Sequence, residues 1–219
     1  GSPNSPRPGI PKKSQIRFAK ELINDNNNIF LFARPGYFIR ERGSSEEDRY
    51  SSGPRDAIKS TIVNYDWKNF QILAPALQNL RKYYKPEKLI LIGHSGGAYQ
   101  GGTIHGKVPG LVDINILISC PCDWEIRKKL SNGKKWETKS QLKKLKKYSP
   151  SFNYEDIDIE SLNVLIVGKD DKNTAPGVSE YYYDLLKKKK LQVKLHIIDG
   201  GHGLRSMPTI GSIIKEYIN

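Results

Sequence analysis

The stretch Lys-Leu-Ile-Leu-Ile-Gly-His-Ser-Gly-Gly-Ala occupies residues 88–98. Its apolar start, which ends at Ile92, predicts a buried strand, and the residues after Gly97 are compatible with a helix. Gly93 and Gly97 flank Ser95 in a Gly-x-Ser-x-Gly string. A nucleophile at a sharp turn between strand and helix needs small neighbours, because the backbone there is strained and closely packed. We therefore expect the Ser95 hydroxyl to project above the sheet, where the N-terminus of the helix faces the reacting oxygen.

Strand-like and helix-like segments alternate along the rest of the chain. Apolar residues recur at helical spacing over 14–23 and 66–84, and Pro75 is expected to kink or break the second helix. Further strands are expected at residues 29–33, 114–119, 162–167 and 193–198, of which the first is an unbroken apolar run. This order predicts a single α/β domain over residues 1–219, with a mainly parallel sheet and helices on both faces. In such sheets the functional residues gather at the carboxyl ends of the strands.

A serine hydroxyl is a poor nucleophile until a base removes its proton, and His202 is placed to be that base. It lies in a Gly-Gly-His-Gly string just after the last predicted strand. The imidazole also needs a carboxylate that fixes its tautomer. Asp171 ends a Gly-Lys-Asp-Asp string directly after the strand predicted at 162–167. Ser95, His202 and Asp171 are therefore the predicted nucleophile, general base and orienting acid.

The neighbouring titratable residues have ordinary structural explanations. We expect packing for His94, a helix end for His105, a strand position for His196, solvent exposure for Asp170 and a turn for Asp199. His202 has a structural alternative of its own, as a turn residue among glycines. Asp123, which follows the strand predicted at 114–119, remains a further candidate for the acid.

These strings resemble three loops of the α/β-hydrolase superfamily, and the similarity runs over nearly the whole chain. Residues 93–97 resemble its nucleophile elbow, Gly168 with Asp171 and Pro176 resembles its acid loop, and residues 201–203 resemble its histidine loop. The order Ser, Asp, His along the chain is also that of the superfamily. The resemblance implies an α/β-hydrolase fold that carries a serine hydrolase site.

Two shorter segments carry the resemblance further. The pair Ser-Pro at 149–150, ahead of the acid strand, is similar to prolyl-oligopeptidase-like and related esterase members. The Arg-Pro-Gly-Tyr segment at 34–37 resembles the loop that follows the fourth strand of such enzymes. The superfamily also has strands that precede the one expected at 29–33. One of them lies beside the nucleophile strand in the middle of the sheet, and its exit carries a His-Gly turn for the oxyanion hole.

The chain begins with Gly-Ser-Pro-Asn-Ser, which is either the tail of such a turn or includes a remnant of cloning. In the first case the resemblance implies that the backbone N–H groups of Ser2 and Gly96 are the two oxyanion donors. The alternative is that the loop near Gly36 and Tyr37 supplies the donor that Ser2 would otherwise give. A missing strand would leave unpaired edges and a weaker core.

The composition excludes few functions. The net charge is +13, but Lys occurs together with Asn and Ile along the whole chain, so we expect no nucleic-acid partner. No apolar run is long enough to span a membrane, and no signal peptide is evident. Cys120 and Cys122 are separated by one residue, which is expected to be too close for an ordinary disulfide. We therefore expect free thiols, a reducing compartment and a cytoplasmic location.

The expected reaction is acyl transfer from a carboxylic ester, small or lipid-like, without a metal or an organic cofactor. Residues 121–154, the long interruption between predicted strands, are expected to form a small helical cap over the site. Trp124 and Trp136 from this cap, together with Tyr37, are the predicted substrate contacts. A peptidase-like amide hydrolase is one alternative, and a non-catalytic binding protein with a basic surface is another. The sequence gives no oligomeric state.

Overall fold

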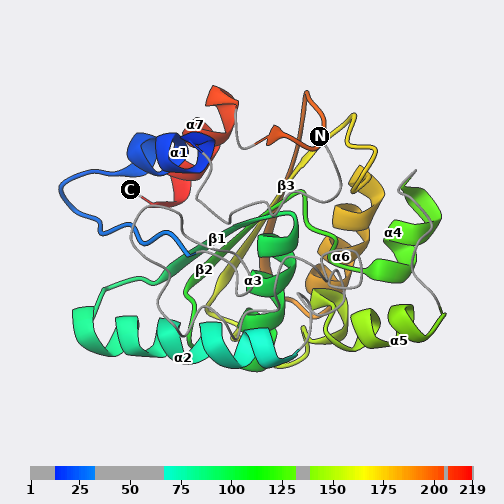
Figure 1. Ribbon diagram of the computed structural model, residues 1–219, viewed down its shortest axis with the longest axis horizontal. Coiled ribbons are helices and arrows are strands. Elements are labelled where there is room, and N and C mark those ends of the chain that lie inside the picture. The colour runs from blue at the N-terminus through cyan, green and yellow to red at the C-terminus, as the bar shows by residue number, and fades with distance from the viewer. Residues whose placement is uncertain (1–12, 33–66, 132–138, 205–206, 219) are drawn as a thin grey trace, which may run out of the picture.

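The computed structural model describes residues 13–32, 67–131, 139–204 and 207–218. Within these ranges the chain forms a four-stranded parallel sheet of order β1-β2-β3-β4 (Figure 1). The strands are β1 (Ile90–His94), β2 (Ile114–Ile118), β3 (Leu162–Gly168) and β4 (Gln192–Ile198). The helices are α1 (Lys13–Leu22), α2 (Trp67–Tyr84), α3 (Gly96–Lys107), α4 (Trp124–Leu130), α5 (Lys139–Lys147), α6 (Pro176–Lys188) and α7 (Pro208–Ile218).

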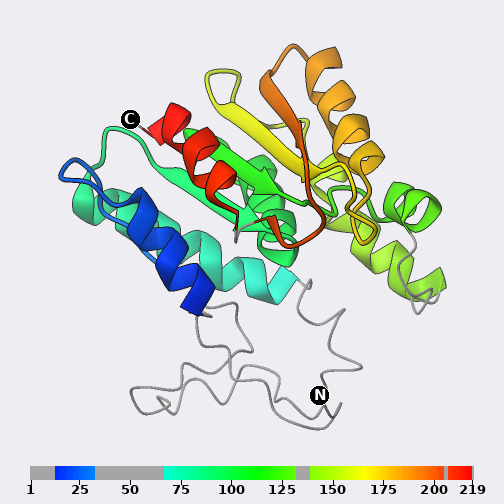
Figure 2. The same cartoon turned by 90° about the horizontal axis from the view of Figure 1, so that it is seen from above.

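Helices cover both faces of the sheet, as the sequence predicts (Figure 2). Alternate strand residues point to opposite faces. Ile116 and Val164 pack against α1 and α7 on one face, whereas Leu117 and Leu165 pack against α3 and α6 on the other. All four side chains are fully buried. Strands β2 and β3 are covered on both sides, and each has a mostly apolar sequence with one buried asparagine.

The strand predicted at 29–33 is not part of the sheet. Residues 29–32 form no strand, and Phe30, Leu31 and Phe32 are each more than 40% exposed. Phe30 packs against Tyr84 at the end of α2, with ring centroids 5.0 Å apart. A short apolar run predicts burial but cannot show whether a partner strand is available. Among the described strands, β1 pairs with β2 alone.

Helix α2 continues through Pro75 without the break expected there. A proline inside a helix removes one hydrogen bond and costs about 3 kcal/mol. Phe70, Ala74 and Leu77 lie on one stripe of the helix and are buried in the same core cluster. This packing on both sides of Pro75 stabilises a single helix.

In the part of the chain that the structure describes, no helix has both the length and the apolar character needed to cross a bilayer.

The described residues of the segment 121–154, which are 121–131 and 139–154, pack into the main core. Trp124 of α4 and Leu145 of α5 are buried in one cluster with Phe70 and Tyr99. A short 3-10 helix, Pro150–Phe152, follows α5 and packs against α3. The side chain of Asp123 caps α4 by accepting a hydrogen bond from the backbone N–H of Ile126 at 2.8 Å. The described part of this segment is thus fixed to the sheet by buried side chains.

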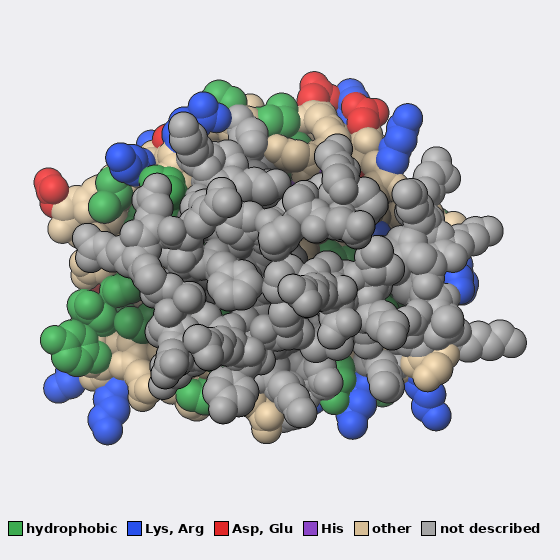
Figure 3. Space-filling model, in the orientation of Figure 1, with side chains coloured by type: hydrophobic (Ala, Val, Ile, Leu, Met, Phe, Trp, Pro, Cys, Tyr) green, Lys and Arg blue, Asp and Glu red, His purple; other side chains and the backbone are tan. Residues whose placement is uncertain are grey.

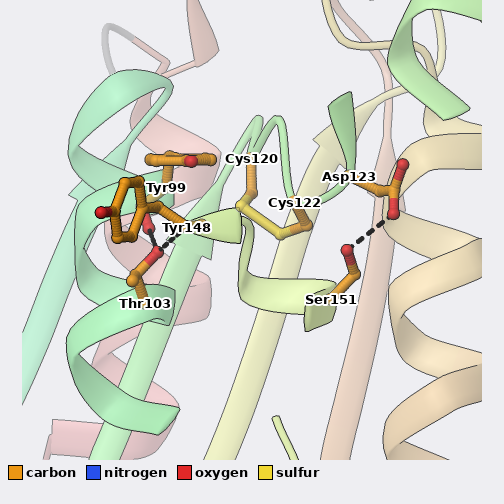
Figure 4. The surroundings of a disulfide bond; sticks show 7 residues. All are labelled: Tyr99, Thr103, Cys120, Cys122, Asp123, Tyr148 and Ser151. Carbon is orange, nitrogen blue, oxygen red and sulfur yellow. Dashed lines mark hydrogen bonds between the residues drawn. A yellow bond between two sulfur atoms is a disulfide. The ribbon is translucent and has the colours of Figure 1, made fainter. Parts of the chain in front are cut away.

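The expectation of two free thiols is wrong, because Cys120 and Cys122 form a disulfide between β2 and α4 (Figure 4). Their Cα atoms are 5.0 Å apart, within the range that a disulfide spans, although only one residue separates them. Both side chains are fully buried. Free thiols were the reason to expect a reducing compartment, and a disulfide removes that reason.

Basic side chains lie at separate places around the margin of the face of the molecule that Figure 3 shows. Some are paired with acids, as in Lys146 with Glu125 and Lys189 with Glu155. Exposed pairs of this kind contribute little to stability.

Candidate active site

Ser95 lies at the sharp turn between β1 and α3. Its backbone has φ 54° and ψ −116°, an uncommon conformation for a residue with a side chain. Its N–H donates to the carbonyl oxygen of Ile118, at the end of β2, at 2.8 Å. Gly93 is needed here, since a Cβ at that position would lie 2.5 Å from the carbonyl oxygen of Gly97. A Cβ at Gly97 would meet no described atom within 4 Å, so packing explains only the first of the two glycines.

The structure brings together the three side chains predicted as nucleophile, base and acid. His202 Nε2 lies 3.0 Å from Ser95 Oγ, and His202 Nδ1 lies 2.9 Å from Asp171 Oδ2. The three residues follow β1, β4 and β3, respectively. Since the carboxyl ends of parallel strands meet at one edge, three distant parts of the sequence converge there.

Asp171 is 2% exposed and accepts hydrogen bonds from three groups. Besides His202, the backbone N–H groups of Asn173 and Thr174 donate to its Oδ1 at 2.9 and 2.8 Å. Burial alone would raise the pKa of Asp171, but the hydrogen bonds from His202 and Thr174 outweigh it and hold the pKa below its ordinary value. The carboxylate is therefore ionised beside the imidazole at neutral pH.

The alternative acids are placed elsewhere. Asp170 is exposed, and Asp199 forms an exposed ion pair with Lys169. Asp123 caps α4 and also accepts a hydrogen bond from Ser151 Oγ at 2.7 Å (Figure 4). The choice of Asp171 over its neighbours thus agrees with the geometry.

The loop that carries His202 is fixed from two sides. His94 Nε2 donates to the carbonyl oxygen of His202 at 2.8 Å, and the two rings lie 5.2 Å apart. A Cβ at Gly168 would overlap the carbonyl oxygen of Gly200, so the acid and histidine loops are in close backbone contact. His94 does more than the packing expected from the sequence, because it holds the backbone of the predicted base.

His105 and His196 have the structural roles that were expected. His196 on β4 contacts the hydroxyl of Tyr217 at 2.7 Å. His105, in the last turn of α3, is 1% exposed and contacts Ser161 Oγ at 3.0 Å. Burial lowers the pKa of His105 to about 4, although nearby Asp158 and Asp113 oppose this effect.

Protonation of His105 is expected to make stability depend on pH. The folded-state pKa of His105 lies below the ordinary value of about 6.5, so the stability contributed by the neutral His105 ring is fully present above pH 6.5. As pH falls from 6.5 toward 4, this stability is lost, and the free energy of unfolding drops by up to about 3 kcal/mol. Urea unfolding at several pH values, compared between wild type and His105→Gln, measures it. An equally steep dependence in the variant would assign the effect to other groups.

Sequence reasoning missed Asn173 and Arg127. Asn173 Nδ2 lies 3.0 Å from His202 Nε2, the same nitrogen that faces Ser95. Arg127 of α4 donates from Nη2 to Asn173 Oδ1 at 2.7 Å and from Nε to the Asn173 carbonyl oxygen at 3.0 Å. Asn173 had a signal, its position two residues after Asp171. Arg127 had none, because it lies 46 residues away in sequence.

The remaining predicted site residues have different outcomes. Gly96 is the first residue of α3, so its N–H lies at the N-terminus of a helix beside Ser95. Trp124 is 3% exposed, with its ring in the core and the Arg127 guanidinium 4.6 Å above it. Ser2, Tyr37 and Trp136 lie outside the described residues. The described ranges contain no group of three His, Cys, Asp or Glu side chains arranged for a metal ion.

Solved structures with the same fold include peptidases and an esterase. The acylaminoacyl peptidase of Pyrococcus horikoshii is 21% identical with a TM-score of 0.58, over 68% of this chain and 27% of that one. The dipeptidyl peptidase 4 of Porphyromonas gingivalis is 12% identical with a TM-score of 0.57, over 68% and 22%. An esterase of Pyrococcus furiosus is 20% identical with a TM-score of 0.51, over 69% and 63%. These likenesses show the α/β-hydrolase fold.

The chain matches about a quarter of the length of the peptidases. No curated protein sequence matches it. The model of the prolyl oligopeptidase family matches residues 25–216, a range that contains the whole Ser95, Asp171 and His202 arrangement. The chain therefore belongs to the prolyl oligopeptidase family.

Proposed function

We propose that this chain is a serine hydrolase that cleaves a carboxylic acyl bond through an acyl-enzyme on Ser95. The observation that supports this most strongly is the continuous contact from Ser95 Oγ through His202 to the buried Asp171 carboxylate. An interaction module has no need of this arrangement. The geometry is that of an activated nucleophile, a base and a group that orients the base.

The first half of the reaction follows from the hydrogen bonds. Asp171 accepts the Nδ1–H of His202, which leaves the Nε2 lone pair directed at the Ser95 hydroxyl. His202 takes the hydroxyl proton as Ser95 Oγ attacks the substrate carbonyl. The Gly96 N–H is the proposed donor to the oxyanion, with a second donor expected from Ser2 or from the loop at Gly36 and Tyr37.

The second half returns the proton. The imidazolium of His202 gives it to the leaving oxygen or nitrogen, which departs and leaves the acyl group on Ser95. Water then attacks the acyl-enzyme with His202 again as base, the bond between the acyl carbon and Ser95 Oγ breaks, and the imidazolium returns the proton to Ser95 as the carboxylic acid leaves. The carboxylate of Asp171 stays ionised throughout and stabilises the imidazolium.

The proposed substrate is a carboxylic ester, with a peptide amide as the second candidate. An ester is the easier substrate to cleave, because an alkoxide leaves more readily than an amine, which must be protonated first. The amide is favoured by membership of the prolyl oligopeptidase family. A short-chain nitrophenyl ester and a short peptide nitroanilide, assayed side by side, separate the two by their kcat/KM values.

A fluorophosphonate probe tests the proposal directly. The wild-type protein is expected to be labelled and to hydrolyse a nitrophenyl ester. In Ser95→Ala both signals are expected to disappear, since the oxygen that is labelled and acylated is absent. Circular dichroism on both proteins checks that they are folded. A folded wild-type protein that is neither labelled nor active would favour the non-catalytic binding protein instead.

A further inference from the structure

Two donors approach a single acceptor at His202. With its Nδ1–H bound to Asp171, the neutral imidazole has one lone pair, on Nε2. Ser95 Oγ and Asn173 Nδ2 each lie 3.0 Å from that nitrogen. The proposed reaction uses the contact with Ser95 and leaves the contact with Asn173 without a role.

The orientation of the Asn173 amide is fixed by Arg127. A guanidinium only donates hydrogen bonds, so the oxygen that faces Arg127 Nη2 at 2.7 Å must be Asn173 Oδ1. The NH₂ group therefore faces His202. Arg127 is itself held in place, with a second bond from Nε to the Asn173 carbonyl oxygen and its guanidinium over the buried Trp124 ring.

The two donors respond differently when His202 gains a proton. The hydroxyl of Ser95 can rotate and accept a hydrogen bond from Nε2–H of the imidazolium. The Asn173 amide cannot turn its oxygen toward the ring without losing the bond to Arg127. An N–H donor would then face an N–H donor. Asn173 thus favours the neutral, proton-accepting form of His202.

We propose that Asn173, locked by Arg127, is a positioning residue that keeps His202 in its neutral form, in which Nε2 carries a lone pair that can accept the serine proton. The inference rests on the proposed function, because it assigns His202 the role of base. The other groups that face the ring are Asp171, which favours the imidazolium, and His94, which holds the loop through a backbone carbonyl. Asn173 acts against Asp171, because Asn173 donates to the neutral ring whereas the carboxylate favours the imidazolium.

The test is the pH at which His202 titrates, followed in two ways. The first is the acid limb of the kcat/KM profile for a nitrophenyl ester. The second is the NMR titration of the His202 ring, assigned by comparison with His202→Gln, which needs no turnover. In Asn173→Ala both midpoints are expected to rise by about 0.5 to 1 pH unit, the size of one neutral hydrogen bond. Asn173→Asp is expected to raise them further, because its carboxylate accepts from the imidazolium.

Two further variants, Arg127→Met and Ser131→Ala, distinguish the orientation of the Asn173 amide from the mere attachment of its loop to α4. Arg127→Met frees the amide to turn and is expected to raise the midpoints about as much as Asn173→Ala. Ser131 Oγ accepts the N–H of Ala175 at 3.0 Å, so it ties the end of α4 to the same loop without touching the Asn173 amide. Ser131→Ala is expected to leave both midpoints unchanged.

Unchanged NMR midpoints in both Asn173→Ala and Arg127→Met would overturn the inference, as would an equal rise in Ser131→Ala. If the wild type shows no turnover, the proposed function fails, and the NMR titration still decides whether Asn173 controls the protonation of His202. If Asn173→Ala does not fold, Arg127→Met and Asn173→Asp provide the same comparison.

Discussion

Asp171→Asn is expected to lower kcat for a nitrophenyl ester by about 10⁴-fold, with a much smaller change in KM. The amide that replaces the carboxylate can donate to His202 Nδ1, which moves the ring proton to Nε2. In the wild type, His202 Nε2 lies 3.0 Å from Ser95 Oγ and can accept the hydroxyl proton. In the variant, Nε2 carries a proton and can no longer accept one. Steady-state kinetics at neutral pH measure the effect.

Asp170→Asn is the matched control, because it removes the same charge one residue earlier in an exposed side chain. Its kcat is expected to stay within about twofold of wild type, since surface substitutions away from a site have small effects. Equal losses in the two variants would show that net charge near the site, and not the contact with His202 Nδ1, matters. In that case the assignment of Asp171 would be wrong.

Gly106→Ala is expected to destabilise the fold by about 3 kcal/mol or more. Gly106 lies in α3, where the added Cβ would overlap the carbonyl oxygen of Asn153. That oxygen belongs to backbone that follows the 3-10 helix and is held by its own turn, with the Asn153 N–H bonded to the Pro150 carbonyl. Neither segment can move without breaking hydrogen bonds. Urea unfolding at neutral pH gives the free energy.

Gly211→Ala is the matched comparison, because Gly211 is a helical glycine with space for a Cβ atom. Among the described residues, a Cβ at Gly211 in α7 would meet only Glu21 Oε2 at 3.6 Å, an ordinary contact. Alanine there is expected to be neutral or to stabilise by about 0.5–1 kcal/mol, since glycine in a helix has the higher entropic cost. Similar stabilities for Gly106→Ala and Gly211→Ala would contradict the close approach of α3 to Asn153.

Most of the fold was predictable because its signals are local. The mostly apolar sequences of β2 and β3 predict strands that are covered on both faces, and the structure agrees. The run at 29–33 carries the same local signal but forms no strand in residues 29–32. Strand pairing depends on a neighbour, and a single segment contains no information about it. The unbroken α2 at Pro75 likewise depends on packing from elsewhere in the chain.

The candidate site was predictable where chemistry and topology coincide. Ser95, Asp171 and His202 follow strand ends, and each occupies a string with the small residues that a tight loop needs. Arg127 follows no strand end and belongs to no such string. Its contact with Asn173 arises only when α4 folds against the acid loop. The disulfide was missed because sequence separation was taken as a measure of distance, whereas the Cα–Cα distance of 5.0 Å is suitable for the bond.

The buried disulfide also provides a kinetic probe of the region next to the site. Neither sulfur is accessible in the folded protein, so a thiol reductant can attack only after the segment between β2 and α4 opens. The rate of reduction at high reductant concentration then equals the opening rate of that segment. Cys120 directly follows Ser119, whose N–H is bonded to the end of β3. Reduction kinetics thus measure how often the segment that follows β2, next to Ser95 and Asp171, opens to solvent.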